Sequence, residues 1–155
     1  VGKTTTSAAL VSGLHAKGFR TLGVDLDPQG NLGFSLGIDI ENGDSIYEVF
    51  KGTVPVDDAL FRTPNGDILP SNILLGSAEM EFNRAGREYL LQNILKEIEH
   101  RYDYIIIDTP SRSQYSYGKR LCGLPTLNRS HGTRSSQFTG DQPIKGNHRF
   151  GTKIL

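Results

Sequence analysis

The chain opens with Val1-Gly2-Lys3-Thr4-Thr5-Thr6, and residues 4–17 fit a helix that Gly18 is placed to end. Gly-Lys-Thr is the second half of the phosphate-loop pattern G-x-x-x-x-G-K-[ST]. Glycine lets backbone amides approach a phosphate, lysine brings a positive charge, and threonine offers a hydroxyl to Mg²⁺. The alternative is an ordinary surface helix with a Gly-Lys start, so the motif needs support from the rest of the chain.

Two strand-like segments follow, and both end in acidic residues. Residues 20–25 fit a strand that ends at Asp25 and leads into the turn-rich Asp27-Pro28-Gln29-Gly30-Asn31. Residues 104–108 form an apolar run that ends at Asp108, which is typical of a strand buried on both faces. This is also the Walker B pattern, whose carboxylate holds Mg²⁺ through water. Either aspartate could instead simply begin a turn.

The remaining pattern predicts an α/β fold with a P-loop NTPase-like parallel sheet flanked by helices. We expect short helices over 45–51 and 56–61, a strand over 67–70, and a further helix starting over 77–82. A longer amphipathic helix is expected over 84–100, with one apolar side made by Tyr89, Leu90, Ile94, Leu95 and Ile98. Ligands of such sheets bind at the carboxyl ends of the strands, where the aspartates fall.

Composition narrows the class of protein. A length of 155 residues suggests one domain, and 36% hydrophobic residues suffice for a core. No apolar run reaches the ~20 residues that a membrane span needs, and no signal peptide is visible. Cys122 is the single cysteine, which excludes an intramolecular disulfide and fits a reducing compartment. We therefore expect a cytoplasmic protein.

Four motifs in this order and spacing resemble the ParA/Soj family of DNA-partitioning ATPases, a deviant Walker A group of P-loop proteins. They are VGKTTT at 1–6, VDLDPQGN at 24–31, ILPSN at 68–72 and YDYIIIDTP at 102–110. The resemblance covers residues 1–110, which we expect to be the N-terminal part of a P-loop ATPase domain. It implies that ATP and Mg²⁺ are the cofactors and that ATP is hydrolysed to ADP and phosphate.

The resemblance also assigns roles to single residues. It implies that Val1, Gly2, Lys3, Thr4 and Thr5 bind the nucleotide, with Thr5 near the α-phosphate. Thr4 and Asp108 would hold Mg²⁺, and Asp25 would lie near it. Asp27 would position the attacking water, and Lys3 would neutralise charge on the β- and γ-phosphates. The family's first loop lysine would precede Val1, so the start of the protein is expected to be missing.

Residues 111–155 depart from the family. They hold eight Lys or Arg and one acid, a net charge of +7 that leaves −7 for residues 1–110. Their apolar residues show no helical or strand period, and we expect the segment to be disordered. Read one base later, the same codons permit the family's LQG segment, so we interpret the tail as out of frame and the sheet as truncated. A basic DNA-binding tail is the alternative.

The resemblance implies a partition protein that acts in plasmid or chromosome segregation. Its partners would be a ParB-like DNA-binding protein, non-specific DNA bound through the C-terminal half that is expected to be missing here, and a second copy in an ATP-dependent homodimer, with no membrane. Such a protein is nucleoid-associated in the cytoplasm. Two alternatives stay open: a MinD-like ATPase that positions other cargo, and an inactive fragment. The exposed edge of the strand at 104–108 would be an association hazard.

Overall fold

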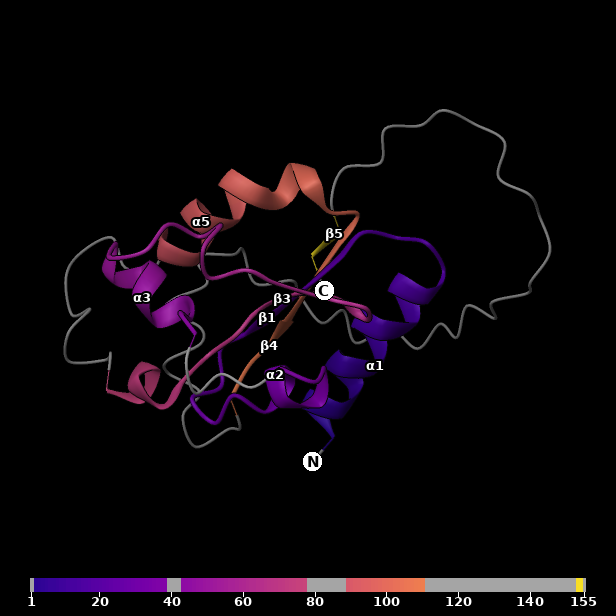
Figure 1. Ribbon diagram of the computed structural model, residues 1–155, viewed down its shortest axis with the longest axis horizontal. Coiled ribbons are helices and arrows are strands. Elements are labelled where there is room, and N and C mark those ends of the chain that lie inside the picture. Colours follow the sequence, from indigo (N-terminus) through magenta and orange to yellow (C-terminus); the bar gives the residue numbers. More distant parts are fainter. Residues whose placement is uncertain (1, 39–42, 78–88, 111–152, 155) are drawn as a thin grey trace, which may run out of the picture.

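The computed structural model describes residues 2–38, 43–77, 89–110 and 153–154, in which a five-stranded sheet lies between two layers of helices (Figure 1). The strand order is β2-β3-β1-β4-β5, with β2 antiparallel to β3 and the other neighbours parallel. The expected α/β class with a mostly parallel sheet is confirmed. The elements are α1 (Lys3–Ala16), β1 (Thr21–Asp25), α2 (Asn31–Ser35), α3 (Ile46–Lys51), β2 (Phe61–Thr63), β3 (Gly66–Leu69), η1 (Ile73–Gly76), α5 (Leu90–Ile98), η3 (Glu99–Arg101), β4 (Tyr104–Asp108) and β5 (Lys153–Ile154).

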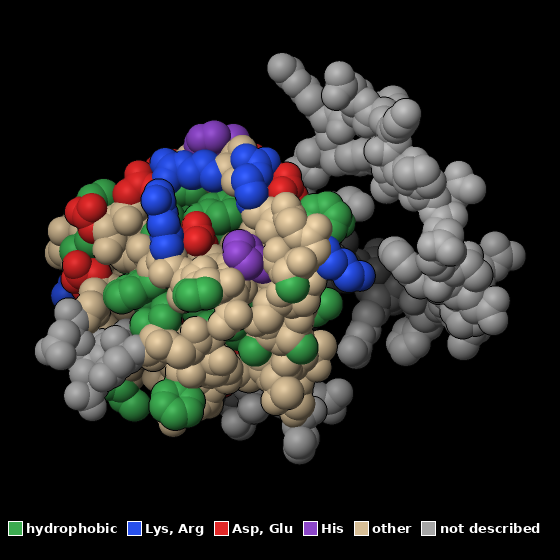
Figure 2. All heavy atoms as spheres, turned by 45° about the vertical axis from the view of Figure 1, so that its right-hand side comes forward, with side chains coloured by type: hydrophobic (Ala, Val, Ile, Leu, Met, Phe, Trp, Pro, Cys, Tyr) green, Lys and Arg blue, Asp and Glu red, His purple; other side chains and the backbone are tan. Residues whose placement is uncertain are grey.

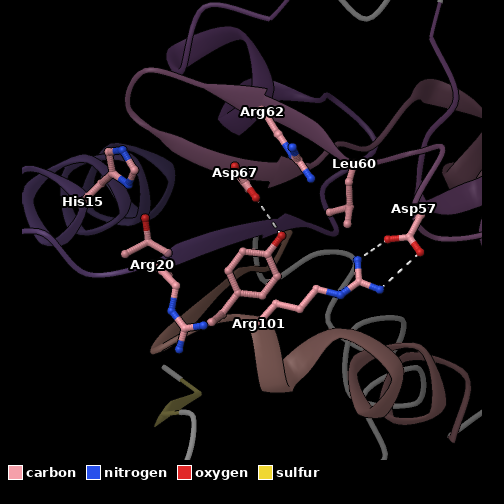
Figure 3. Close-up of a pocket in the computed structure, with 9 residues that line it drawn as sticks. His15, Arg20, Asp57, Leu60, Arg62, Asp67 and Arg101 are labelled. Atoms are coloured by element: carbon pink, nitrogen blue, oxygen red, sulfur yellow. Dashed lines mark hydrogen bonds and ion pairs between the residues drawn. The ribbon is translucent and has the colours of Figure 1, made fainter.

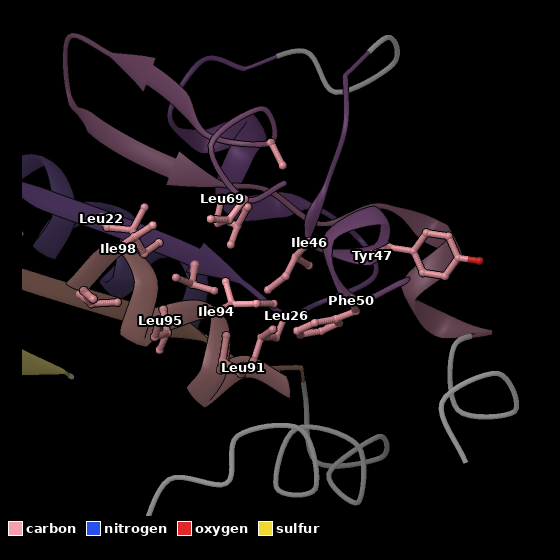
Figure 4. Close-up of a cluster of buried hydrophobic side chains, with 14 of the residues drawn as sticks. Leu22, Leu26, Ile46, Tyr47, Phe50, Leu69, Leu91, Ile94, Leu95 and Ile98 are labelled. Carbon is pink, nitrogen blue, oxygen red and sulfur yellow. The ribbon is translucent and has the colours of Figure 1, made fainter. Parts of the chain in front are cut away.

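Each face of the sheet has its own core. The larger core joins β1, β3 and β4 to α3 and α5, and Figure 4 shows Leu91 and Leu95 of α5 in one cluster with Leu22 of β1 and Leu26, which follows β1. The smaller core joins α1 and α2 to the opposite face through Val11, Leu32, Leu36, Ile68 and Ile106. Because side chains alternate along a strand, Asp108 lies on the same face as Ile106, toward α1.

The helix and the two strands that carry the motifs lie where the sequence predicts them. α1, β1 and β4 begin and end within one residue of the expected bounds. α3 begins where expected because Ser45 Oγ accepts a hydrogen bond from the Tyr47 N–H (3.1 Å) while the Glu48 carboxylate accepts one from the Ser45 N–H (2.9 Å). This reciprocal cap satisfies amides that the first helical turn leaves without partners.

The helix expected over 56–61 is wrong. The segment turns and then enters β2, whose residues pair antiparallel with β3. The turn between the two strands is fixed by Thr63, whose hydroxyl donates to the Gly66 carbonyl (2.7 Å) and accepts from the Asn65 N–H (3.0 Å). Pairing with β3 therefore overrides a short and weak helical pattern. The structure also contains α2 and η1, which the sequence did not predict.

The apolar side expected for the helix over 84–100 is partly wrong. Tyr89 is 50% exposed, whereas Leu91 is fully buried with Ile94, Leu95 and Ile98. The described helix starts at Leu90, so the buried stripe follows the spacing 91, 94, 95, 98. The helix expected from Ser77 and the first part of the helix expected over 84–100 fall on residues 78–88, outside those the structure describes.

The expected bare edge of β4 is wrong at its first two residues. Tyr104 and Ile105 pair in parallel with Lys153 and Ile154 of β5. Backbone pairing covers this edge because unpaired strand N–H and C=O groups favour any neighbouring strand.

The disorder that we expect over 111–152 and at 155 falls outside the described residues. In the described part of the chain, no helix is long and apolar enough to cross a membrane.

We expect Gly66→Ala to destabilise the protein by at least about 2 kcal/mol. Gly66 has φ +116°, and a Cβ there would lie 2.6 Å from Thr21 Oγ1 and 2.8 Å from Val11 Cγ1. Urea unfolding followed by circular dichroism measures the change. The control is Gly13→Ala in α1, where nothing lies within 4 Å and the helix should gain about 0.5–1 kcal/mol. Equal effects of the two changes would contradict the account of this turn.

Candidate functional site

The polar residues of the motifs meet at the end of the sheet where β1 and β4 finish. In the parallel register of these strands Asp25 lies beside Asp108, and the Leu26 N–H continues the ladder to the Asp108 carbonyl (2.9 Å). A cavity of about 400 Å³ opens between this edge and the start of α1, lined by Gly2, Lys3, Thr6, Ser7, Ile107, Asp108 and Thr109. The cavity therefore joins the first motif of the chain to the last.

The entry to α1 is shaped to receive an anion. Gly2 has a left-handed backbone (φ 88°, ψ 2°), which only glycine adopts without strain, and α1 begins at the next residue. Thr6 closes the first turn, since both its N–H (2.9 Å) and its hydroxyl (2.7 Å) donate to the Gly2 carbonyl. Free amides of a first helical turn carry partial positive charge and bind phosphate groups well.

Lys3 brings a full positive charge to the same cavity. Its Nζ donates a hydrogen bond to the carbonyl of Pro110, 2.9 Å away and just beyond the end of β4. The ammonium is thus held between the start of α1 and the end of β4. An anion in the cavity would compete with this carbonyl for the ammonium, and a phosphate accepts a charge-assisted bond more strongly than a neutral carbonyl does.

Asp108 is the group that best fits a cation. Its side chain is 2% exposed, and Oδ1 accepts a hydrogen bond from the Ser7 hydroxyl (3.1 Å). Oδ2 is buried and has no partner among the described residues. An unsatisfied buried carboxylate oxygen is costly, and a hydrated Mg²⁺ is a partner that would satisfy it. The residues present therefore fit Mg²⁺ at this position.

Ser7 was missed by the sequence reading. It lies one helical turn after Lys3, so it reaches the same face of α1, and its side chain is 8% exposed. The helical period applied to the Gly-Lys-Thr start would have found it. Its hydroxyl binds one oxygen of Asp108 and leaves the other without a partner among the described residues.

Asp25 is held differently from its neighbour. It is fully buried, and its two oxygens accept hydrogen bonds from the N–H groups of Asp27 (2.9 Å) and Leu32 (3.0 Å). Burial raises the pKa of Asp25 to about 7, and the charges of Asp108 and Asp27 add to the rise, while the two backbone bonds oppose it. In this structure the carboxylate anchors the loop between β1 and α2.

The other residues expected in the site lie beside the cavity rather than in its lining. Asp27 is half-buried, and its Oδ1 accepts from the Gln29 N–H (3.1 Å) in the turn that follows β1. Thr4 and Thr5 belong to the first turn of α1, one half-buried and the other exposed. Val1 falls outside the described residues. The structure thus brings Gly2, Lys3 and Asp108 around one cavity.

The pKa of Asp25 predicts how stability depends on pH. Because its folded pKa (about 7) lies above the value of 3.8 for an ordinary Asp, the folded state is favoured most when this group is protonated. We expect the free energy of unfolding to fall on the order of 3 kcal/mol between about pH 5 and about pH 8. The pKa values of Asp57 and Asp103 are lowered by their arginine partners, so the stability they contribute is lost only in more acidic solution.

Urea titrations at several pH values without Mg²⁺ measure this slope. Asp25→Asn is the comparison, because an amide does not ionise and the fall should be much smaller. Only the slopes of the free energy of unfolding against pH are compared. The absolute stabilities differ for another reason, because Asn cannot accept both backbone hydrogen bonds. An identical fall in the variant would show that another group causes the dependence.

Comparison with known families and proteins agrees with this geometry. A family model described as an AAA domain matches residues 1–118. The chromosome partitioning protein ParA of Myxococcus xanthus is 41% identical over 114 residues, which cover 71% of this chain and 40% of that protein. The sporulation initiation inhibitor protein Soj of Bacillus subtilis is 41% identical over 116 residues, covering 71% and 45%. The chain thus spans less than half the length of these relatives.

Solved structures show the same relationship. Cobyrinic acid a,c-diamide synthase from Mycobacterium smegmatis, with bound ATP analogue and magnesium, matches with a TM-score of 0.62 and 33% identity, over 77% of this chain and 62% of that one. The septum site-determining protein MinD of Pyrococcus horikoshii, complexed with Mg-ADP, matches with a TM-score of 0.61 and 28% identity, over 77% and 48%. Together with the matched residues 1–118, these similarities place the chain in the AAA domain family, within its ParA/Soj group.

Proposed function

We propose that this chain binds ATP with Mg²⁺ and that the protein hydrolyses ATP to ADP and phosphate as a ParA/Soj-like partition ATPase. One observation carries the proposal: Oδ2 of Asp108 is buried without a partner among the described residues, and Asp108 lines the same cavity as Lys3. An anion with an attached divalent cation complements this pair of charges. The solved relative with a bound ATP analogue and magnesium supports the choice of ligand.

Each residue of the site has a part in this proposal. The backbone amides from Val1 to Thr5 receive the phosphates, with the Lys3 ammonium on the β- and γ-phosphates. The Thr4 hydroxyl and the free oxygen of Asp108 hold the hydrated Mg²⁺, which would neutralise charge on the phosphates when bound. Asp25 supports this arrangement because it accepts a hydrogen bond from the Asp27 N–H and so fixes the loop that carries Asp27.

Hydrolysis would proceed by attack of a water oxygen on the γ-phosphorus, with loss of the bond to the bridging oxygen of ADP. Asp27 orients this water through a hydrogen bond. Its Oδ1 accepts from the Gln29 N–H, so the turn residues hold the carboxylate in one orientation. Lys3 stabilises the negative charge that develops on the phosphate oxygens.

The biological role follows from the relatives. The ParA and Soj similarities support action in plasmid or chromosome segregation, in the nucleoid region of the cytoplasm, with a ParB-like protein and non-specific DNA as partners. An ATP-dependent homodimer is supported by exposed apolar side chains that follow β1 and β3, since Phe34 is 82% and Ile73 70% exposed. A MinD-like role is the second candidate, supported by the match to MinD.

The first test is nucleotide binding. We expect a fluorescent ATP analogue with Mg²⁺ to bind this chain at micromolar concentration, and Lys3→Ala to weaken binding at least about tenfold, because a charge-assisted contact to phosphate is lost. Lys17→Ala is the matched control, since it removes the same side chain at the far end of the same helix. Absence of binding, or an equal effect of both changes, would reject the proposal and favour an inactive chain.

The second test concerns Ser7. We expect Ser7→Ala to weaken Mg²⁺-dependent ATP binding by about tenfold, because Asp108 loses the hydrogen bond that fixes its orientation. Binding measured in EDTA should not change, and Ser7→Thr should restore part of the affinity. Ser12→Ala, in the same helix but away from Asp108, serves as the control. A Ser7→Ala protein that binds ATP·Mg²⁺ as the parent does would rule out this positioning role.

A further inference from the structure

A second and larger cavity lies at the opposite end of the sheet. It has a volume of about 570 Å³ and opens where β1 begins, far along the strands from Asp25 and Asp108. Figure 3 shows its walls: His15 from the last turn of α1, Arg62 and Asp67 from the β2–β3 hairpin, and Arg101 from the segment that precedes β4. Its size falls in the range of small-molecule sites. Neither the motifs nor the proposed nucleotide site accounts for it.

The acidic groups of this cavity already have partners. Arg101 binds both oxygens of Asp57, one of them at 3.2 Å from Nη2. The Tyr102 hydroxyl donates to Oδ2 of Asp67 (2.8 Å), and burial, strengthened by this bond, raises the pKa of Tyr102. Tyr102 thus remains a neutral hydroxyl whose proton is already directed to Asp67. Much of the acceptor capacity of the lining is therefore used inside the protein.

Two of the basic side chains, Arg62 and His15, are in the opposite state. Arg62 lies across from Asp67 in the register of the hairpin, and its charge helps to lower the pKa of Asp57, but its guanidinium makes no hydrogen bond or ion pair with any described residue. Its five N–H groups are thus unused. His15 Nδ1 is buried and has no partner in the part of the chain that the structure describes. Arg20 binds Asp103 and lies at the edge of the cavity.

We propose that this cavity is a binding site for a small molecule that carries an oxyanion, either a carboxylate or a phosphate group, with Arg62 as its main contact. The Arg62 guanidinium has no partner in the described part of the chain, whereas the nearby Asp57 and Asp67 carboxylates already accept hydrogen bonds. Such a lining favours a ligand that accepts hydrogen bonds, and oxyanions have that property. A guanidinium holds such a group with two parallel hydrogen bonds, and His15 Nδ1 offers a further polar contact. Figure 2 shows Lys and Arg side chains gathered beside acidic and His side chains on one face of the molecule.

The cavity has room for more than a bare ion. Three arginines and two aspartates line it, so its net charge is small and positive. The long-range attraction of an anion is therefore weak, and affinity must come from direct contacts. The partly buried Leu60 adds an apolar wall for the remainder of the ligand. This cavity shares no lining residue with the cavity at Asp108.

Titration of inorganic phosphate and of acetate, followed by NMR, tests the proposal. The Lys3→Ala chain is used so that the first cavity does not report phosphate binding. We expect saturable shifts of the Arg62 side-chain Nε–H signal and of the His15 ring signals at millimolar concentration. A phosphate group as ligand predicts tighter binding of phosphate than of acetate, and a carboxylate predicts the reverse.

Two substitutions of Arg62 test whether its guanidinium binds the anion. Arg62→Gln should weaken binding at least about tenfold, and Arg62→Lys should retain part of the affinity because the charge remains. Lys96→Gln, which removes an exposed charge from α5, is the control and should leave the affinity unchanged. Shifts that rise linearly without saturation up to about 100 mM, or that persist in Arg62→Gln, would show only ionic screening and overturn the proposal.

Discussion

The parallel pairing of β1 with β4 is the constraint on which the site depends. It places Asp25 and Asp108 side by side at the ends of neighbouring strands, in a buried setting where two like charges repel. The two carboxylates have different hydrogen-bond partners. Two backbone amides donate to Asp25, whereas Asp108 accepts from one hydroxyl and, within the described part of the chain, keeps one oxygen free. One group thus supports a loop, and the other faces the cavity.

Helix α1 links the two ends of the sheet, and its ends have different chemistry. Its first turn, with Gly2, Lys3 and Ser7, faces the end of β4. Its last turn carries His15 to the second cavity, where arginines and aspartates are largely paired with each other. The helix itself is fixed by Val11, which packs on the sheet between these ends. A rigid α1 therefore keeps both cavities in place with one apolar contact surface.

Motifs with a strict chemical requirement could be predicted from the sequence. The Gly2-Lys3 start and the apolar run ending at Asp108 gave the helix, the strand and the two charges of the cavity, because the residue types and the burial pattern are both specific. The roles assigned to Thr4, Thr5, Asp25 and Asp27 stay predictions. Residues 111–155 stay an expected tail, apart from the pair that forms β5.

What could not be predicted depends on tertiary contacts. The β2 strand forms because β3 lies beside it, and no local period announces this. Ser7 acquires a role only when β4 is placed against α1, and Tyr89 proves exposed because the buried stripe of α5 follows Leu91, Ile94, Leu95 and Ile98. The second cavity is assembled from five separate segments, none of which contains a recognisable motif. Sequence patterns report single elements, whereas these features arise between elements.

The central claim is that a divalent cation bound with ATP lies next to the free oxygen of Asp108. Mn²⁺ in place of Mg²⁺ tests it most directly, because its unpaired electrons broaden NMR signals of nearby nuclei. With Mn²⁺ and ATP the amide signals of Ser7, Ile107 and Thr109 should broaden strongly, while those of Thr21 and Tyr102 at the far end of the sheet broaden much less. Equal broadening at both ends, or none near Asp108, would contradict the account.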